Sequence, residues 1–187
     1  MKKVVLLGDS IRQIGYGARV AELLKDEFTV WQPTDNCRFA QYTLRGLFDW
    51  QSDIEGSDII HWNNGHWDLC ELFGDGTFTP VERYVELMVR IAKLLKQRAK
   101  TVIFATTTPV LPQNPYNRNE VIAQFNAAVV PELEKLGVVI NDLNTLLAAD
   151  IPACIREDDM IHLTDAGIEL AAAQVAACIR TEAEKLK

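Results

Sequence analysis

The chain has 187 residues, which suits one domain and is enough to bury a hydrophobic core. Apolar residues make up 48% and charged residues 24%, a composition that excludes a largely disordered chain. The net charge of −7 repels a phosphate backbone, so nucleic acid is excluded as the expected partner, and no segment is apolar for long enough to span a membrane.

We expect a single domain over residues 1–187, because no repeat, linker or low-complexity stretch interrupts the sequence. The basic start at Met1–Lys3 leads into an apolar run that is too short for a signal peptide, so we expect a cytoplasmic protein unless a leader has been removed. The four cysteines show no Cys-x-x-Cys spacing, which favours reduced, packed thiols over disulfides or metal ligands. The oligomeric state has no signal in the sequence.

Five short apolar runs alternate along the chain with segments of helical periodicity. Continuous apolar runs, rather than alternating ones, are typical of strands that are buried on both faces of a sheet. The predicted strands are Val4–Leu7, Thr29–Trp31, Ile59–Trp62, Val102–Ala105 and Val138–Ile140.

The clearest helix is predicted over Val81–Arg98, where apolar residues recur at three and four positions and form one stripe. Thr79 is its expected cap and Pro80 its expected first residue. The other predicted helices are Ala18–Lys25, Cys37–Phe48, Asn119–Leu136 with a break before Pro131, and Thr164–Lys187 with Thr164 as cap.

The alternation of strands and helices predicts an α/β protein with a parallel sheet of about five strands and helices on both faces. Ligands of such sheets bind beyond the carboxyl ends of the strands. The segments that directly follow the predicted strands are therefore the candidates for a functional site.

Ser10 directly follows the first predicted strand. Alone it is a weak signal, because a serine in such a turn also suits a phosphate cradle or a plain turn. His162, just before the last helix, can be the base that a serine nucleophile requires. Asp159 can fold back onto this imidazole and orient it, with Asp158 and Glu157 as competitors for that role.

A serine nucleophile also requires N–H donors where negative charge develops on the substrate oxygen. Ser10 can supply its own backbone N–H. The loops that follow the second and third strands contain further candidate donors, namely Gly46 and the pair Asn63-Asn64.

These motifs together resemble the SGNH (GDSL-type) hydrolase superfamily across essentially the whole chain. The resemblance rests on Gly8-Asp9-Ser10-Ile11, a mid-chain glycine, an Asn-containing loop, and Asp-x-x-His-Leu-Thr-x-x-Gly before the last helix. It implies a flavodoxin-like three-layer α/β/α sandwich that hydrolyses esters or thioesters without a metal or organic cofactor. It further implies Ser10 as the nucleophile, Asp159 and His162 as its partners, and Gly46 with the Ser10 backbone in the oxyanion hole.

The third block departs from the pattern of the superfamily. That block usually reads Gly-x-Asn-Asp, whereas this chain has Gly65-His66-Trp67-Asp68, so Trp67 stands at the asparagine position. An indole N–H is a poor substitute for the amide. We therefore expect Asn64, or as second choice Asn63, to supply the side-chain donor of the oxyanion hole.

Two other groups of polar residues are candidates for a site. His61, His66, Asp68 and Cys70 match no familiar metal spacing, so no metal site is expected, and His66 and Trp67 are instead candidates for the wall of a substrate pocket. The polar loop 114–118 contacts substrate or is simply solvated.

The leading hypothesis is an esterase that removes a short acyl group, such as acetyl, from a small molecule or carbohydrate through an acyl-serine intermediate. One alternative is a thioesterase or lysophospholipase-like acylhydrolase. Another is a non-catalytic, flavodoxin-like module that binds a phosphate or nucleotide at the Ser10 loop, and a catalytically inactive homologue is a further one.

Overall fold

The structure is a computed structural model that describes residues 1–186, and its centre is a five-stranded, all-parallel sheet. The strand order is β2-β1-β3-β4-β5. The strands are β1 (Lys2–Leu7), β2 (Phe28–Trp31), β3 (Ser57–Trp62), β4 (Ala99–Ala105) and β5 (Val139–Asn141). Each one overlaps a predicted apolar run, and the predicted parallel sheet is confirmed.

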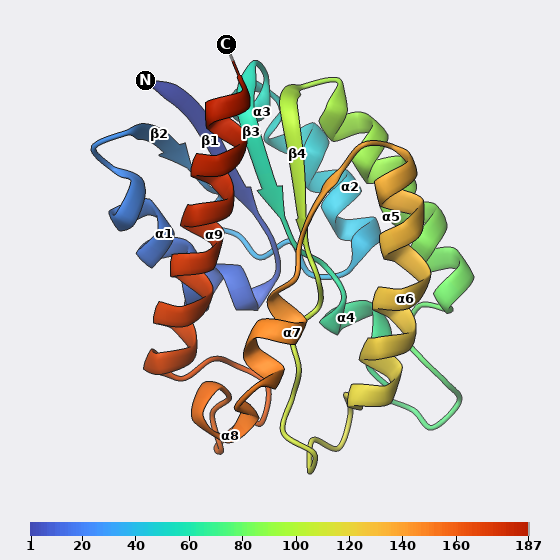
Figure 1. The fold of residues 1–187 in the computed structure, drawn as a ribbon. Helices are drawn as coiled ribbons and strands as arrows, with labels where there is room; N and C mark the ends of the chain where they lie inside the picture. The colour runs from blue at the N-terminus through green and yellow to red at the C-terminus, as the bar shows by residue number, and fades with distance from the viewer. Residues whose placement is uncertain (187) are drawn as a thin grey trace.

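Helices cover both faces of this sheet, which gives the predicted three-layer sandwich (Figure 1). One face carries α2 (Ala40–Asp49), α5 (Val81–Lys96) and α6 (Asn119–Lys135), and the other carries α1 (Gly17–Leu24) and α9 (Asp165–Lys185). The shorter elements are the π-helix η1 (Ile11–Tyr16), α3 (Gln51–Ile54), α4 (His66–Leu69), α7 (Leu143–Ala148) and α8 (Ile151–Cys154). Lys187, where the last predicted helix ends, lies outside the described residues.

The hydrophobic core has two halves, one on each face of the sheet. Along β1, Val5 and Leu7 pack with α2, α5 and α6, whereas Val4 and Leu6 pack with α1 and α9. Because successive side chains of a strand point to opposite faces, a strand at the centre of the sandwich must be apolar throughout. This explains the continuous apolar runs in the sequence.

The predicted break before Pro131 is wrong, because α6 continues through this residue to Lys135. Proline removes the N–H that would donate to the carbonyl of Ala127, but Ala127 and Pro131 are both exposed, so water can reach that carbonyl. Val129 and Leu133, on the other side of the helix, are fully buried and hold both halves against the core.

The sequence predicts a threonine cap for both α5 and α9, and the structure confirms only the cap of α9. Thr164 caps α9 as predicted, since its hydroxyl accepts the N–H of Gly167 at 3.1 Å. Thr79 does not cap α5, where Pro80 occupies the N-cap position without a side-chain hydrogen bond. The Thr79 hydroxyl instead donates to Oδ1 of Asp68 at 2.8 Å.

The carboxyl ends of the strands point away from the chain termini, toward the lower end of the molecule in Figure 1, where α4, α7 and α8 lie. The four cysteines are unpaired in the structure, and three of them are buried. None of the helices within residues 1–186 combines the length and the hydropathy that a membrane crossing requires.

Candidate active site

The turn after β1 brings Ser10 to the carboxyl end of the sheet. Gly8 is required at its start, because a Cβ there would lie 2.0 Å from Oδ1 of Asn63. Asp9 is fully buried, and its Oδ1 accepts the N–H of Ile11 at 2.9 Å, which tightens the turn. Ser10 follows at the N-cap of η1, and its side chain makes no capping hydrogen bond. The hydroxyl is therefore free to face another partner.

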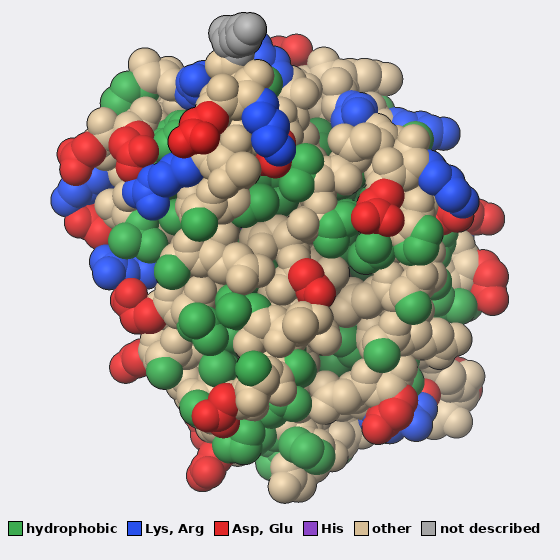
Figure 2. Space-filling view, in the orientation of Figure 1, with side chains coloured by type: hydrophobic (Ala, Val, Ile, Leu, Met, Phe, Trp, Pro, Cys, Tyr) green, Lys and Arg blue, Asp and Glu red, His purple; other side chains and the backbone are tan. Residues whose placement is uncertain are grey.

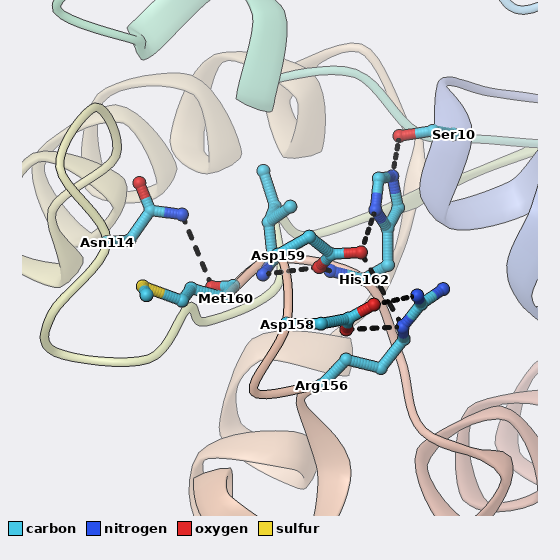
Figure 3. Close-up of polar contacts among 8 residues, drawn as sticks. Ser10, Asn114, Arg156, Asp158, Asp159, Met160 and His162 are labelled. Carbon is cyan, nitrogen blue, oxygen red and sulfur yellow. Dashed lines mark hydrogen bonds and ion pairs between the residues drawn. The ribbon is translucent and has the colours of Figure 1, made fainter.

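The loop before α9 supplies that partner (Figure 3). Oδ1 of Asp159 accepts the backbone N–H groups of Ile161 at 3.1 Å and His162 at 2.9 Å, which fixes the carboxylate within one turn of chain. Oδ2 of Asp159 lies 3.0 Å from Nδ1 of His162. The neighbouring Asp158 pairs with Arg156 instead, so the structure brings Asp159, among the acidic candidates of this loop, to the imidazole.

Nε2 of His162 lies 2.8 Å from Oγ of Ser10, although the two residues are 152 positions apart in the sequence. Partial burial alone would raise the pKa of Asp159, but the N–H groups of His162 and Ile161 and the imidazole of His162 hold that pKa below its ordinary value. The carboxylate is therefore charged and can only accept a hydrogen bond. It follows that Nδ1 carries a proton, and in the neutral imidazole Nε2 is then the nitrogen that can accept the proton of the Ser10 hydroxyl.

Ser10 and His162 open into a pocket of about 280 Å³. Its remaining lining residues are His66, Trp67, Cys70, Leu72, Tyr116, Asn117 and Ile161. Apolar and aromatic side chains predominate, and none of the lining residues is a Lys, Arg, Asp or Glu. The pocket thus suits a neutral group bound next to the serine hydroxyl.

The structure places His66 and Trp67 in this pocket wall, where the sequence made them candidates. His66 is buried. Its Nδ1 lies 3.3 Å from Nδ2 of Asn117, and its Nε2 lies 2.9 Å from the hydroxyl of Thr108. Burial lowers the pKa of His66 to about 3, so this imidazole is neutral near pH 7. Across residues 1–186, no three His, Cys, Asp or Glu side chains form a cluster that could hold a metal ion.

The structure shows which hydrogen bonds the expected oxyanion donors already make. The backbone N–H of Ser10 makes no hydrogen bond within residues 1–186, so it is free to donate. The Asn63 amide donates to Asp9 at 2.7 Å and accepts the Tyr16 hydroxyl at 2.8 Å. The Asn64 amide donates to the carbonyl of Arg38 at 2.7 Å. Both asparagines thus carry hydrogen bonds that stabilise the loops, and their part in an oxyanion hole stays a prediction.

The expectation for Gly46 needs correction. Gly46 lies inside α2, where its N–H is used by the helical hydrogen bonds and its carbonyl accepts the N–H of Trp50 at 2.8 Å. A Cβ at this position would lie 2.4 Å from the indole ring of Trp50. The glycine is required for close packing of Trp50 against the helix, and its amide is not available to a substrate.

The loop after β4 contributes more residues to the pocket than the sequence indicated. The sequence singled out 114–118 but left open whether the loop was merely solvated. In the structure, Tyr116 and Asn117 line the pocket, and Asn114, which accepts their backbone N–H groups, is buried. Several asparagines near a proline are equally typical of an exposed turn. Only the tertiary contacts identify these residues as part of the pocket.

Comparisons with known proteins were made for both the sequence and the structure. No protein-family model matches the sequence, and no curated protein matches it. Solved structures match over nearly the whole chain. A lipase/acylhydrolase from Enterococcus faecalis aligns with a TM-score of 0.78 at 19% identity, covering 97% of this chain and 96% of its own. The acetyl xylan esterase AlAXEase aligns with a TM-score of 0.76 at 20% identity, covering 95% of this chain and 99% of its own.

A putative GDSL-like lipase from Parabacteroides merdae aligns with a TM-score of 0.75 at 14% identity, covering 92% of this chain and 93% of its own. At such low identities the similarity concerns the fold. The shared fold covers at least 92% of this chain and at least 93% of each of the three proteins. The chain therefore has the fold of the SGNH (GDSL-type) hydrolases, as the resemblance of its motifs implied.

Proposed function

We propose that the protein is a serine-dependent carboxylic ester hydrolase that removes a short acyl group from a neutral small molecule or carbohydrate. The observation that carries this proposal is the chain of contacts from Asp159 through His162 to Ser10, with distances of 3.0 and 2.8 Å, at the edge of an open pocket. A serine beside an oriented imidazole is what nucleophilic acyl transfer requires. A phosphate cradle would need no such base.

The proposed reaction has two halves. Oγ of Ser10 attacks the ester carbonyl carbon while its proton passes to Nε2 of His162, and Asp159 stabilises the imidazolium that forms. The Ser10 N–H donates to the oxyanion. The tetrahedral intermediate collapses, and the leaving alcohol takes the proton from Nε2. Water then attacks the acyl-serine with His162 as base, releasing the carboxylic acid and the free serine.

The preference for a short, neutral ester rests on the pocket. Its volume accommodates a short acyl group, and the absence of Lys and Arg from its lining disfavours substrates that carry phosphate groups, such as coenzyme A thioesters and lysophospholipids. On the face shown in Figure 2, Lys and Arg side chains gather toward the end that carries the termini and are sparse at the opposite end. Solved structures described as acetyl xylan esterases share the fold, which agrees with an acetyl ester.

The test is hydrolysis of neutral acetyl, butyryl and octanoyl esters, and of acetylated xylo-oligosaccharides, by the wild type and by Ser10→Ala. We expect the acetyl esters to react fastest, and Ser10→Ala to lower kcat by roughly 10⁴–10⁶-fold. Ser52→Ala, which removes an exposed serine on α3, is the matched control. Equal activity of the two variants would rule out Ser10 as the nucleophile, and faster turnover of octanoyl esters would favour the long-chain acylhydrolase.

A further inference from the structure

The loop that carries Asp159 and His162 contains a strained residue. Met160 has φ of +64°, in the left-handed region that side chains other than glycine seldom adopt. Such a conformation costs on the order of 1 kcal/mol or more and persists only where surrounding contacts enforce it. Those contacts decide how Asp159 and His162, on either side of Met160, are aligned.

Two donors from the loop after β4 hold the carbonyl of Met160. The backbone N–H of Leu111 donates to it at 3.0 Å, and Nδ2 of Asn114 donates at 3.3 Å (Figure 3). Asn114 is buried, so its amide cannot exchange this bond for one to water at low cost. It is a side chain that reaches across from another loop to the segment between Asp159 and His162.

The other end of the same amide holds the pocket wall. Oδ1 of Asn114 accepts the backbone N–H groups of Tyr116 at 2.9 Å and Asn117 at 2.8 Å. Asn117 in turn donates through Nδ2 to the carbonyl of His66 at 3.1 Å. One buried side chain therefore joins the loop of the proposed base to the residues that line the pocket.

We propose that Asn114 is a positioning residue that aligns Asp159 and His162 with Ser10 and, through its second end, sets the pocket wall. This inference rests on the proposed function. Asn114 makes no hydrogen bond to Ser10, Asp159 or His162, so it acts through the backbone of Met160. Because a misplacement of about 1 Å can cost on the order of 10²-fold in rate, the loss of this anchor reaches the reaction.

Two substitutions separate the two ends of the amide. Asn114→Asp keeps an oxygen that accepts the N–H groups of Tyr116 and Asn117 but loses the donor to Met160, whereas Asn114→Ala loses both. We expect kcat for an acetyl ester to fall by about 10–100-fold in both variants, and KM to rise only in Asn114→Ala. Gln174→Ala is the matched control, because this amide on α9 also donates to a backbone carbonyl, that of Asp142 at 3.1 Å.

A second readout needs no substrate. The proton on Nδ1 of His162, held against Asp159, gives a far-downfield proton resonance when the pair is aligned. We expect this resonance in the wild type and in Gln174→Ala, and its loss or broadening in Asn114→Ala and Asn114→Asp.

Wild-type kcat in the two Asn114 variants would overturn the inference, and so would a lowered kcat with an unchanged resonance. If Asn114→Ala does not fold, Asn114→Asp decides the outcome. A wild type that hydrolyses no ester but shows the resonance, with its loss in the Asn114 variants, would contradict the proposed function and leave the positioning role supported.

Discussion

At the scale of single residues, the proposed site combines one local contact, between Asp159 and His162, with one long-range contact, between His162 and Ser10. Asp159 and His162 are three positions apart, and backbone N–H groups fold the carboxylate onto the imidazole within one turn. Such a local pattern is visible in a sequence. The pairing of His162 with Ser10 spans 152 positions. The sequence predicts it only because a serine nucleophile requires a base and because the two motifs resemble those of the SGNH hydrolases.

The oxyanion donors were harder to predict, because a donor is defined by where an N–H points. The sequence offers Gly46 as a mid-chain glycine, yet glycine also appears where a large side chain packs against a helix, as Trp50 does here. Asn63 and Asn64 follow β3 as expected, but their amides are bound to Asp9 and to the carbonyl of Arg38. The sequence alone does not distinguish a glycine or asparagine that stabilises the fold from one that donates to a substrate oxyanion.

Gly46→Ala separates the packing role from a catalytic one. The added Cβ would meet the Trp50 ring, and overpacking of this kind costs about 1–3 kcal/mol, partly offset by the roughly 1 kcal/mol gained in helix propensity. We expect a lower free energy of unfolding in urea and an unchanged kcat. Gln41→Ala, on the exposed side of α2, is the control and stays within about 0.5 kcal/mol of the wild type. A fall in kcat of about 10²–10³-fold with unchanged stability would restore Gly46 to the oxyanion hole.

At the scale of elements, the long helices and the strands were predicted and the short helices were not. A long amphipathic helix carries several turns of periodic signal, whereas α4, α7 and α8 have one turn or little more. The predicted cap of α5 is wrong because of a tertiary contact. Thr79 has the chemistry of a cap, but a buried carboxylate from another segment, Asp68, takes its hydroxyl.

Asp68 also anchors the start of α2, and its contribution to the stability of the fold depends on pH. Its Oδ2 accepts the N–H of Ala40, the first residue of α2, at 2.8 Å. Burial raises the pKa of Asp68 to about 7 against the hydrogen bonds from Ala40 and Thr79. Between pH 4 and 7 the folded state therefore keeps a proton that the unfolded state has released, so this group's contribution to stability falls as the pH rises through that window.

Asp68→Asn removes this titration. We expect the stability of the wild type relative to Asp68→Asn to fall between pH 5 and pH 8, by on the order of 2–3 kcal/mol, as measured by urea unfolding at each pH. Asp26→Asn provides the control for loss of an acidic residue at an exposed site. A difference that stays constant over this range, or that grows with pH, would contradict a protonated Asp68 near neutrality.

At the scale of the whole molecule, the sequence was most informative about the sheet. A five-stranded parallel sheet that is buried on both faces needs continuous apolar strands, and the sequence contains one such run for each strand. The helices between the strands then follow from the rule that consecutive parallel strands are joined by crossover connections, which pack on the faces of the sheet. The pocket wall was predicted only in part. His66 and Trp67 were candidates for it, but their meeting with Tyr116 and Asn117 depends on the tertiary fold.

The central claim is that Ser10 is an activated nucleophile, and reaction with a fluorophosphonate probe tests it most directly. Intact-mass analysis and peptide mapping would be done on the wild type, Ser10→Ala and His162→Ala. We predict one adduct on Ser10 of the wild type, none in Ser10→Ala, and greatly slowed labelling in His162→Ala, because the Ser10 hydroxyl then loses the base 2.8 Å away. No adduct on the wild type, under conditions that label a control serine hydrolase, would contradict the account.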